Sequence, residues 1–164
     1  MGVDSSFEAF AQARLGQLLG FGYRLTGNRE AAEDLVQEAL ARTAQRWRSV
    51  RRSDRPEVYV QTVMARLHID RWRRDRREDL RAVLADVQGP ETDREAVMDM
   101  RQALDQLAPR QRTVIILRYY LDWTEAQAAE AMGCSVGTVK SQTSDALHRL
   151  RRLLGDAEPQ EGRR

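Results

Sequence analysis

Apolar side chains recur every three or four residues along most of the chain, which is the period of an amphipathic helix. In the first segment this stripe consists of Phe7, Phe10, Ala11, Leu15, Leu18, Leu19, Gly22 and Leu25. Gly27 is suited to end that helix and Asn28 to cap the next, whose apolar face runs from Ala32 to Trp47. No segment has the alternating pattern of a β-strand, so the sequence predicts an all-α fold.

Proline and capping signals mark the starts of the next three helices. Pro56 suits the first turn of a third helix and Pro109 that of a fifth. Between them, Thr92 and Glu95 fit a capping box for a fourth. The inward face of this fourth helix is predicted to consist of Ala96, Val97, Met100, Ala103, Leu104 and Leu107. Residues 80–92 contain a Gly-Pro turn signal and are predicted to form a linker.

The last two helices form a helix-turn-helix. Thr124 and Gln127 fit a capping box for a short helix that ends at Gly133, and Ser135 caps the final helix. A recognition helix presents small polar side chains of its first turns to the major groove of DNA. The candidate groove residues are Ser135, Val136, Thr138, Lys140, Ser141, Gln142 and Asp145. An ordinary antiparallel helix pair is the alternative, but it does not need the sequence GTVKS at this place.

Composition excludes several classes of site. The chain has 164 residues, enough for one ordinary domain or two small ones. With one cysteine (Cys134) and two histidines (His68 and His148), it offers no disulfide framework and little material for a metal site or catalytic triad. Both histidines are predicted to lie on helix surfaces. We expect no metal, no cofactor and no enzymatic activity, and no membrane segment, because no apolar run reaches the ~18 residues that one requires.

Positive charge is concentrated in two blocks. Residues 46–77 contain eleven basic and four acidic residues, a net charge of +7, and residues 108–154 contain seven and four, a net charge of +3. The intervening residues 78–107 contain three and eight, a net charge of −5. Two basic surfaces separated by an acidic segment are typical of a protein that binds a polyanion. From charge alone, the two basic blocks could equally be ordinary helix surfaces that face solvent.

Two motifs carry a resemblance to a known family. The segment LAPRQRTVIILRYYLDWTEAQAAEAMGCSVGTVKS, which ends at Ser141, resembles region 4 of sigma-70-type transcription initiation factors. Independently, YRLTGNREAAEDLVQEALARTAQRW resembles region 2 of the same family. Their order and spacing are similar to those of the extracytoplasmic-function (ECF) subgroup, which keeps only these two regions. The segment VYVQTVMARLHIDRWRRDRR points to small actinobacterial-type members.

The resemblance implies a domain organisation and a set of partners. It implies sigma region 2 over residues 1–79, an acidic linker over 80–92, region 4 over 93–154 and a polar tail over 155–164. In the family, the DLVQE face binds a coiled coil of the large subunit of core RNA polymerase. The residues that would do so here are Asp34, Leu35, Gln37, Glu38 and Arg42. Carboxylates one turn apart suit arginines on a partner helix, although without the family this would be an ordinary acidic surface.

In the family, the third helix melts the promoter at the downstream (−10) element. Arginines would hold phosphates and aromatic rings would trap unpaired bases. The residues implied here are Tyr59, Arg66, Arg71, Trp72, Arg73, Arg74, Arg76 and Arg77, with Trp72 equally interpretable as a core residue. Promoter DNA is therefore the second predicted partner. The recognition helix would read the upstream (−35) element.

Three positions depart from the family pattern. Arg66 stands where the third helix often has an asparagine, which affects the −10 base that is read. The recognition helix usually continues GTVKSRxxRAL, whereas this chain has Gln142 and Asp145 at the arginine positions. We expect weaker phosphate contacts and a non-standard −35 element, because glutamine can pair with adenine and aspartate can accept from cytosine.

The predicted function is that of a cytoplasmic alternative sigma factor that binds core RNA polymerase and directs promoter recognition and melting. Regulation is expected to come from its level of synthesis or from a partner such as an anti-sigma factor. The main alternative is a stand-alone helix-turn-helix regulator. An enzyme that acts on nucleic acid is disfavoured, because the sequence has no cluster of carboxylates and no His/Cys set for metal or base chemistry. A helical bundle that serves only as an adaptor is disfavoured because it would not need the recognition helix.

Overall fold

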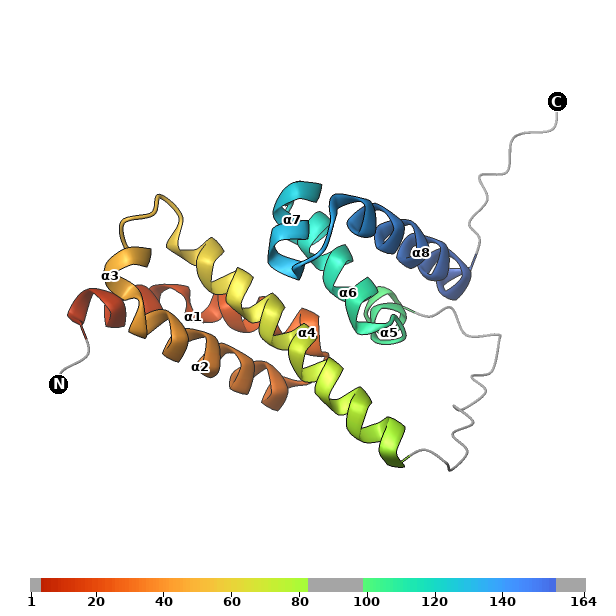
Figure 1. Cartoon of the computed structure of the whole chain (residues 1–164), viewed down its shortest axis with the longest axis horizontal. Helices are drawn as coiled ribbons and strands as arrows, with labels where there is room; N and C mark the ends of the chain where they lie inside the picture. Colours follow the sequence, from red (N-terminus) through yellow and green to blue (C-terminus); the bar gives the residue numbers. More distant parts are fainter. Residues whose placement is uncertain (1–3, 83–98, 156–164) are drawn as a thin grey trace.

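The structure is a computed structural model that describes residues 4–82 and 99–155, with side chains described over 4–77 and 99–155. The first half of the chain contains α1 (Ser5–Thr26), α2 (Arg29–Gln45), α3 (Trp47–Val50) and α4 (Pro56–Ala82) (Figure 1). The second half contains α5 (Met100–Asp105), α6 (Pro109–Ile115), a π-helical turn η1 (Ile116–Tyr120), α7 (Glu125–Met132) and α8 (Val136–Leu154). The described residues contain no strand, which confirms the all-α prediction.

Capping residues set the helix boundaries as predicted. Gly27 ends α1 in a left-handed conformation with φ +69°, and Gly133 ends α7 with φ +63°. These are conformations that glycine adopts without steric cost. The Thr124 hydroxyl accepts from the Gln127 main-chain N–H, and the Gln127 side chain accepts from the Thr124 N–H. Ser135 caps α8 by accepting from the Thr138 N–H at 3.1 Å.

The core of the first half lies where α1 and α4 pack on α2. Its largest fully buried side chains are Leu18, Phe21, Leu25, Leu35, Met64, Val36 and Val60. The predicted stripe of α1 is wrong at two places, since Leu15 is 43% exposed and Phe21, which the stripe omits, is fully buried. Helix α2 ends at Gln45, and Trp47 begins α3 and packs in a separate cluster with Phe7.

The two halves pack directly on each other, which the sequence does not predict. Helix α4 contacts α6 and α7, and α1 contacts α6. A single cluster of buried apolar residues runs from Leu18 through Met64 and Leu117 to Leu150. In Figure 1 the helix-turn-helix half lies along one side of α4. The halves are therefore joined by a shared core as well as by the linker.

The predicted linker is described only in part. Helix α4 continues to Ala82, so its last three residues fall within the predicted 80–92. The Thr92–Glu95 capping box and the tail beyond Gly155 lie outside the described residues. Helix α5 begins after Asp99, whose carboxylate caps it by accepting from the Gln102 N–H, and Met100 is 54% exposed rather than inward. Across 4–82 and 99–155, none of the helices has both the length and the apolar character needed to cross a bilayer.

Candidate nucleic-acid interface

Helix α2 displays a polar face on the side opposite its core contacts. Asp34 and Gln37 are exposed, and Glu38 is half-buried. Leu35, which was expected to contact a partner, has no exposed surface and packs in the core beneath this face. That expectation is corrected: Leu35 supports the helix from within, while its polar neighbours are available to a partner.

Glu38 is the most constrained residue of that face. Its Oε1 accepts from Arg42 Nη2 at 2.7 Å, and its Oε2 accepts from Arg71 Nη2 of α4 at 2.5 Å. The hydrogen bond from Arg71 is the main reason that the pKa of the Glu38 carboxyl lies below its usual value. Hydrogen bonds that stabilise the charged form have this effect. The sequence predicts neither arginine as a partner of Glu38.

The carboxyl-terminal half of α4 forms a basic ridge. Arg73, Arg74, Arg76 and Arg77 are exposed, whereas Arg71 and Trp72 are half-buried. Trp72 does not belong to either described core cluster, and the Arg76 guanidinium lies 5.3 Å from the centroid of its ring. The carboxylate of Asp70 lies 3.9 Å from the guanidinium of Arg73. Exposed cations beside an aromatic ring are the elements that single-stranded nucleic acid requires.

A polar pocket of about 400 Å³ lies between the end of α2 and the first half of α4. It brings together three predicted site residues, Arg42 from α2 and Tyr59 and Arg66 from α4. The remaining walls are formed by Gln45, Arg46, Val63, Leu67 and Asp70. An aromatic ring, an amide group and guanidinium donors around one cavity can stack on a base and hydrogen-bond to its edge. The sequence does not identify Gln45 and Arg46 as pocket residues.

The recognition helix is accessible at its start. Ser135, Val136, Lys140, Ser141 and Asp145 are exposed, and Thr138 and Gln142 are half-buried. All seven predicted residues therefore keep some accessible surface on the first three turns of α8. Cys134 is half-buried at the preceding turn and packs against the core. Over the described residues, no group of three or more histidines, cysteines and carboxylates is placed to hold a metal ion.

Two arginines connect the halves. Arg66 donates from Nη2 to the main-chain carbonyl of Glu130 at 2.9 Å, at the carboxyl end of α7. Arg112 of α6 is buried, and its Nε donates to the Arg24 carbonyl at 2.7 Å while its Nη2 pairs with Asp105. Cations at helix carboxyl ends are favoured by the helix dipole. Arg66, a predicted DNA contact, is thus occupied by the other half of the protein.

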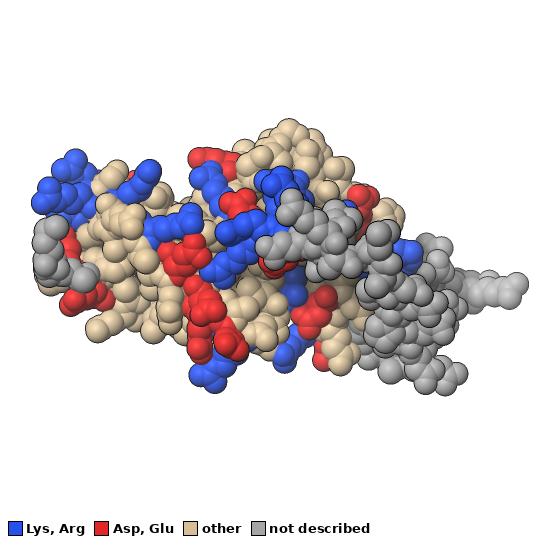
Figure 2. Space-filling model, turned by 60° about the horizontal axis from the view of Figure 1, so that its bottom comes forward, with Lys and Arg blue, Asp and Glu red and all other residues tan. Residues whose placement is uncertain are grey.

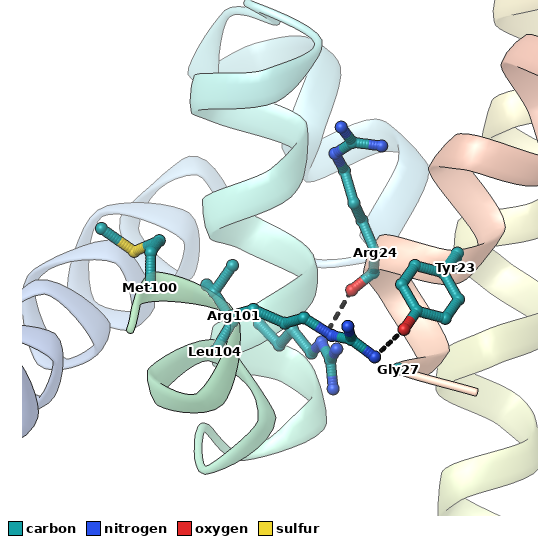
Figure 3. Close-up of a pocket in the computed structure, with 7 residues that line it drawn as sticks. Tyr23, Arg24, Gly27, Met100, Arg101 and Leu104 are labelled. Carbon is teal, nitrogen blue, oxygen red and sulfur yellow. Dashed lines mark hydrogen bonds between the residues drawn. The ribbon is translucent and has the colours of Figure 1, made fainter. Parts of the chain in front are cut away.

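A second pocket, of about 340 Å³, lies at the same junction (Figure 3). It is lined by Tyr23, Arg24, Gly27, Met100, Arg101, Leu104 and Arg112. Arg101 donates to the Tyr23 hydroxyl across it, and the Arg24 guanidinium lies 4.0 Å from the centroid of the Tyr120 ring. The sequence does not predict either of these contacts, because they join residues 78 and 96 positions apart.

His68 corrects another expectation. It was predicted to lie on a helix surface, but burial together with the positive charges of Arg112 and Arg71 lowers its pKa to about 4. Its Nε2 is buried and has no hydrogen-bond partner among the described residues. The other histidine, His148, is exposed as predicted. His68 is therefore half-buried near the junction of the halves and uncharged at neutral pH.

Charges of both signs alternate on the face of the molecule shown in Figure 2. A band of acidic side chains crosses that face, and basic side chains lie on both sides of it. The predicted sites therefore do not form one uniformly positive surface. A partner with positive charges and a polyanion can each bind a different part of such a surface.

Comparisons with known proteins identify the family to which the chain belongs. The family model for sigma-70 region 2 matches residues 10–78, and that for sigma-70 region 4 matches residues 97–150. The chain is 34% identical to the RNA polymerase sigma-E factor of Streptomyces coelicolor over 94% of this chain and 89% of that protein. It is 33% identical to the ECF RNA polymerase sigma factor SigL of Mycobacterium tuberculosis over 82% of this chain and 80% of that protein.

The chain belongs to the ECF group of sigma-70-family RNA polymerase sigma factors. It is an alternative sigma factor that directs promoter recognition in transcription initiation. The region 2 match over the first half disfavours the alternative of a stand-alone helix-turn-helix regulator. Among solved structures, the sigma factor RpoE in complex with the anti-sigma factor NepR from Bartonella quintana is similar, with a TM-score of 0.68 and 27% identity. That similarity covers 92% of this chain and 98% of the other, and so includes both halves.

Proposed function

We propose that this sigma factor binds core RNA polymerase through the polar face of α2. Asp34 and Gln37 are exposed there, and the ionised Glu38 lies one turn beyond Asp34. Two carboxylates and an amide on adjacent turns match arginines of a partner helix, since guanidinium–carboxylate hydrogen bonds are strong and directional. Arg42, the fifth residue predicted for this surface, pairs with Glu38 and also lines the polar pocket. It therefore belongs to the border between the docking face and the DNA-binding surface.

We propose that α4 melts the promoter at the −10 element. The pocket formed by Arg42, Tyr59 and Arg66 is the observation that carries this proposal, because an extruded base needs an enclosed site that offsets the cost of unstacking. The exposed arginines of the basic ridge then hold the phosphates of the single strand. No nucleotide is hydrolysed in such a step, and we assign no catalytic residue.

We propose that the start of α8 reads the −35 element in the major groove. Ser135, Val136, Lys140 and Ser141 are exposed on its first turns. Asp145 is exposed and Gln142 is half-buried two turns into the helix, where both can reach base edges. The carboxylate of Asp145 would repel phosphates, so this helix relies more on base contacts than one with arginines at these places.

Use of both DNA sites requires the halves to separate. The −10 and −35 elements lie about 25 base pairs apart, which is roughly 85 Å of B-form DNA at 3.4 Å per base pair. In the structure the two halves that carry these surfaces are held together by a shared core and by the Arg66–Glu130 contact at 2.9 Å. We infer that the described arrangement is a resting form and that the halves part when the protein binds polymerase and promoter.

We propose that a protein partner such as an anti-sigma factor stabilises this resting form. The RpoE chain that resembles this one over both halves is bound to the anti-sigma factor NepR. We place the protein in the cytoplasm, where its DNA and polymerase partners are found. Affinity purification from the source organism is expected to recover such a partner together with polymerase, and recovery of polymerase alone would count against it.

The docking proposal is tested by size-exclusion chromatography with core RNA polymerase. The wild-type chain should co-elute, and the variant Asp34→Arg, Gln37→Ala, Glu38→Arg should not. A matched control, Glu8→Arg with Asp54→Arg, makes the same change in net charge at exposed positions outside α2. Co-elution of both variants would refute the assignment of the docking face.

A further inference from the structure

Glu38 connects the two proposed surfaces of the first half through one carboxylate. One oxygen holds Arg42 of its own helix at 2.7 Å, and the other holds Arg71 of α4 at 2.5 Å. Arg71 begins the basic ridge that is proposed to hold DNA phosphates. A residue of the polymerase face therefore neutralises a residue of the DNA face within the free protein.

The pair is well suited to exchange partners. The side chains of Glu38 and Arg71 are 34% and 32% exposed, so water and incoming groups reach both. Ion pairs at such positions contribute little net stability, because water screens them and ordering two long side chains is costly. Asp34, one turn earlier, is exposed and makes no ion pair with the described part of the chain, so it does not hold any arginine in this way.

We propose that Glu38 is an exchangeable counterion that couples polymerase docking to DNA binding. When arginines of the polymerase helix pair with Glu38, Arg71 loses its internal partner and becomes available to a phosphate of the promoter strand. Free protein keeps Arg71 neutralised and so binds DNA less well. The inference rests on the proposed docking face, and it makes Glu38 and Arg71 positioning residues for each other.

The coupling must be reciprocal. If polymerase binding at Glu38 frees Arg71 for DNA, then DNA that takes up Arg71 must strengthen polymerase binding by the same factor. Removing Arg71 abolishes the same internal pair and leaves Glu38 held by Arg42 alone, so it should also strengthen polymerase binding. A static structural pair makes a different prediction, because loss of either partner would then weaken the fold and strengthen neither interaction. The two cases are distinguished by the direction of the change in affinity.

The first test measures DNA binding without polymerase. Fluorescence anisotropy of a labelled 20-nucleotide single strand of mixed sequence is recorded for wild type and Glu38→Gln at several salt concentrations. The variant should bind about two- to fivefold more tightly, with a salt dependence steeper by roughly 0.7 for the added phosphate contact. Equal affinity, including no measurable binding by either protein, would overturn the proposal.

The control for this test is Glu33→Gln. Glu33 lies on the same helix and pairs with Arg29 at 2.9 Å, so the substitution makes the same charge change and also releases an arginine. Among the described residues, Glu33 has no ion-pair partner on α4. An equal gain in DNA affinity for both variants would mean that net charge alone is responsible. When Glu38→Gln is made in a protein that already carries Arg71→Gln, its gain in DNA affinity should be no larger than that of Glu33→Gln, because there is no Arg71 to release.

The second test measures affinity for core RNA polymerase without DNA. Arg71→Gln should bind about two- to fivefold more tightly than wild type, whereas Arg149→Gln, the same change at an exposed position of α8, should not. Unchanged or weaker binding of Arg71→Gln would overturn the coupling. If the assignment of the α2 face to polymerase binding is itself wrong, Glu38→Arg should bind core RNA polymerase as tightly as wild type. That result is distinct from the results that test the coupling.

Discussion

The buried side chain of Arg112 reaches from α6 to the carboxyl end of α1, where its Nε donates a 2.7 Å hydrogen bond to the main-chain carbonyl of Arg24. Its Nη2 also pairs with Asp105 at 2.7 Å, so one guanidinium joins α1, α5 and α6. The carbonyl of Arg24 is one of the last in α1, and such groups lack partners within their own helix. Arg112 therefore joins the two sigma regions by satisfying a helix end.

We expect Arg112→Met to loosen the junction. The substitution keeps much of the side-chain volume but leaves the Arg24 carbonyl without its donor, which should cost about 1–3 kcal/mol in the free energy of unfolding. Urea denaturation measures this loss, and small-angle scattering should show a larger radius of gyration. Arg149→Met, at an exposed position of α8, is the control. A variant as stable and as compact as wild type would contradict this role for Arg112.

Gly27 should be less replaceable than Gly133, although both have left-handed backbone conformations. A Cβ at Gly27 would lie 2.7 Å from Asp105 Oδ1 and 2.9 Å from Arg112 Nη2, whereas a Cβ at Gly133 would have no atom within 4 Å. Alanine at either place carries a conformational cost of about 1–2 kcal/mol. Gly27→Ala should lose about 1–3 kcal/mol more, because the paired Asp105 and Arg112 side chains must move from the positions in which they join the helices.

Thermal unfolding of the two glycine variants, recorded side by side, checks this difference. The variant at Gly27 should also show the larger increase in radius of gyration, since its added methyl group is directed at the other half of the protein. Equal losses for the two variants would indicate that α1 and α6 do not approach each other so closely in solution.

His68 should make stability depend on pH. Its pKa is lowered to about 4 in the folded protein, and its ordinary value is 6.5. Above pH 6.5 the residue is neutral in both states and has no effect. Between pH 6.5 and 4 the unfolded chain takes up a proton that the folded protein does not, so stability falls, by up to about 3 kcal/mol, and it changes no further below pH 4.

The comparison with His68→Gln isolates this effect from the carboxylates that titrate in the same range. Denaturation midpoints are measured from pH 7.5 to pH 4.5 for both proteins. The loss of stability on acidification should be smaller in the variant. Parallel curves for the two proteins would contradict the burial of His68.

The sequence predicts the helices well because their boundaries are determined locally. Gly27, Thr124 and Ser135 act on backbone groups within four residues, and their roles follow from residue type and spacing. Errors arise where burial depends on distant partners. Leu15 fits the apolar period but is 43% exposed, whereas Phe21 is fully buried in the core that α1 shares with α2 and α4.

The candidate site could be predicted only as separate motifs. The recognition helix and the α2 face are each contained in one segment, so their residues can be identified from the sequence. The Glu38–Arg71 pair, the polar pocket and the contact of Arg66 with Glu130 join α2 to α4 or one half to the other. Such contacts depend on how helices pack, and in a chain with many arginines the sequence does not indicate which arginine finds which partner.

Promoter choice should respond to the two unusual residues of α8. Gln142→Arg with Asp145→Arg adds two cations to the recognition helix and removes its carboxylate. We expect tighter DNA binding with a salt dependence steeper by about 2, together with a changed preference for the −35 base pairs. Selection from a randomised −35 library measures the preference. Unchanged preference and affinity would refute the role of these residues in a non-standard element.

Transcription of genomic DNA from the source organism by its own core RNA polymerase, with and without this sigma factor, tests the central claim most directly. Sequencing of the RNA ends should reveal start sites that require the sigma factor and share upstream and downstream elements. The docking variant of α2 should lose all of these sites, and the Gln142→Arg, Asp145→Arg variant should shift to others. No start sites beyond those of core polymerase alone would contradict the account.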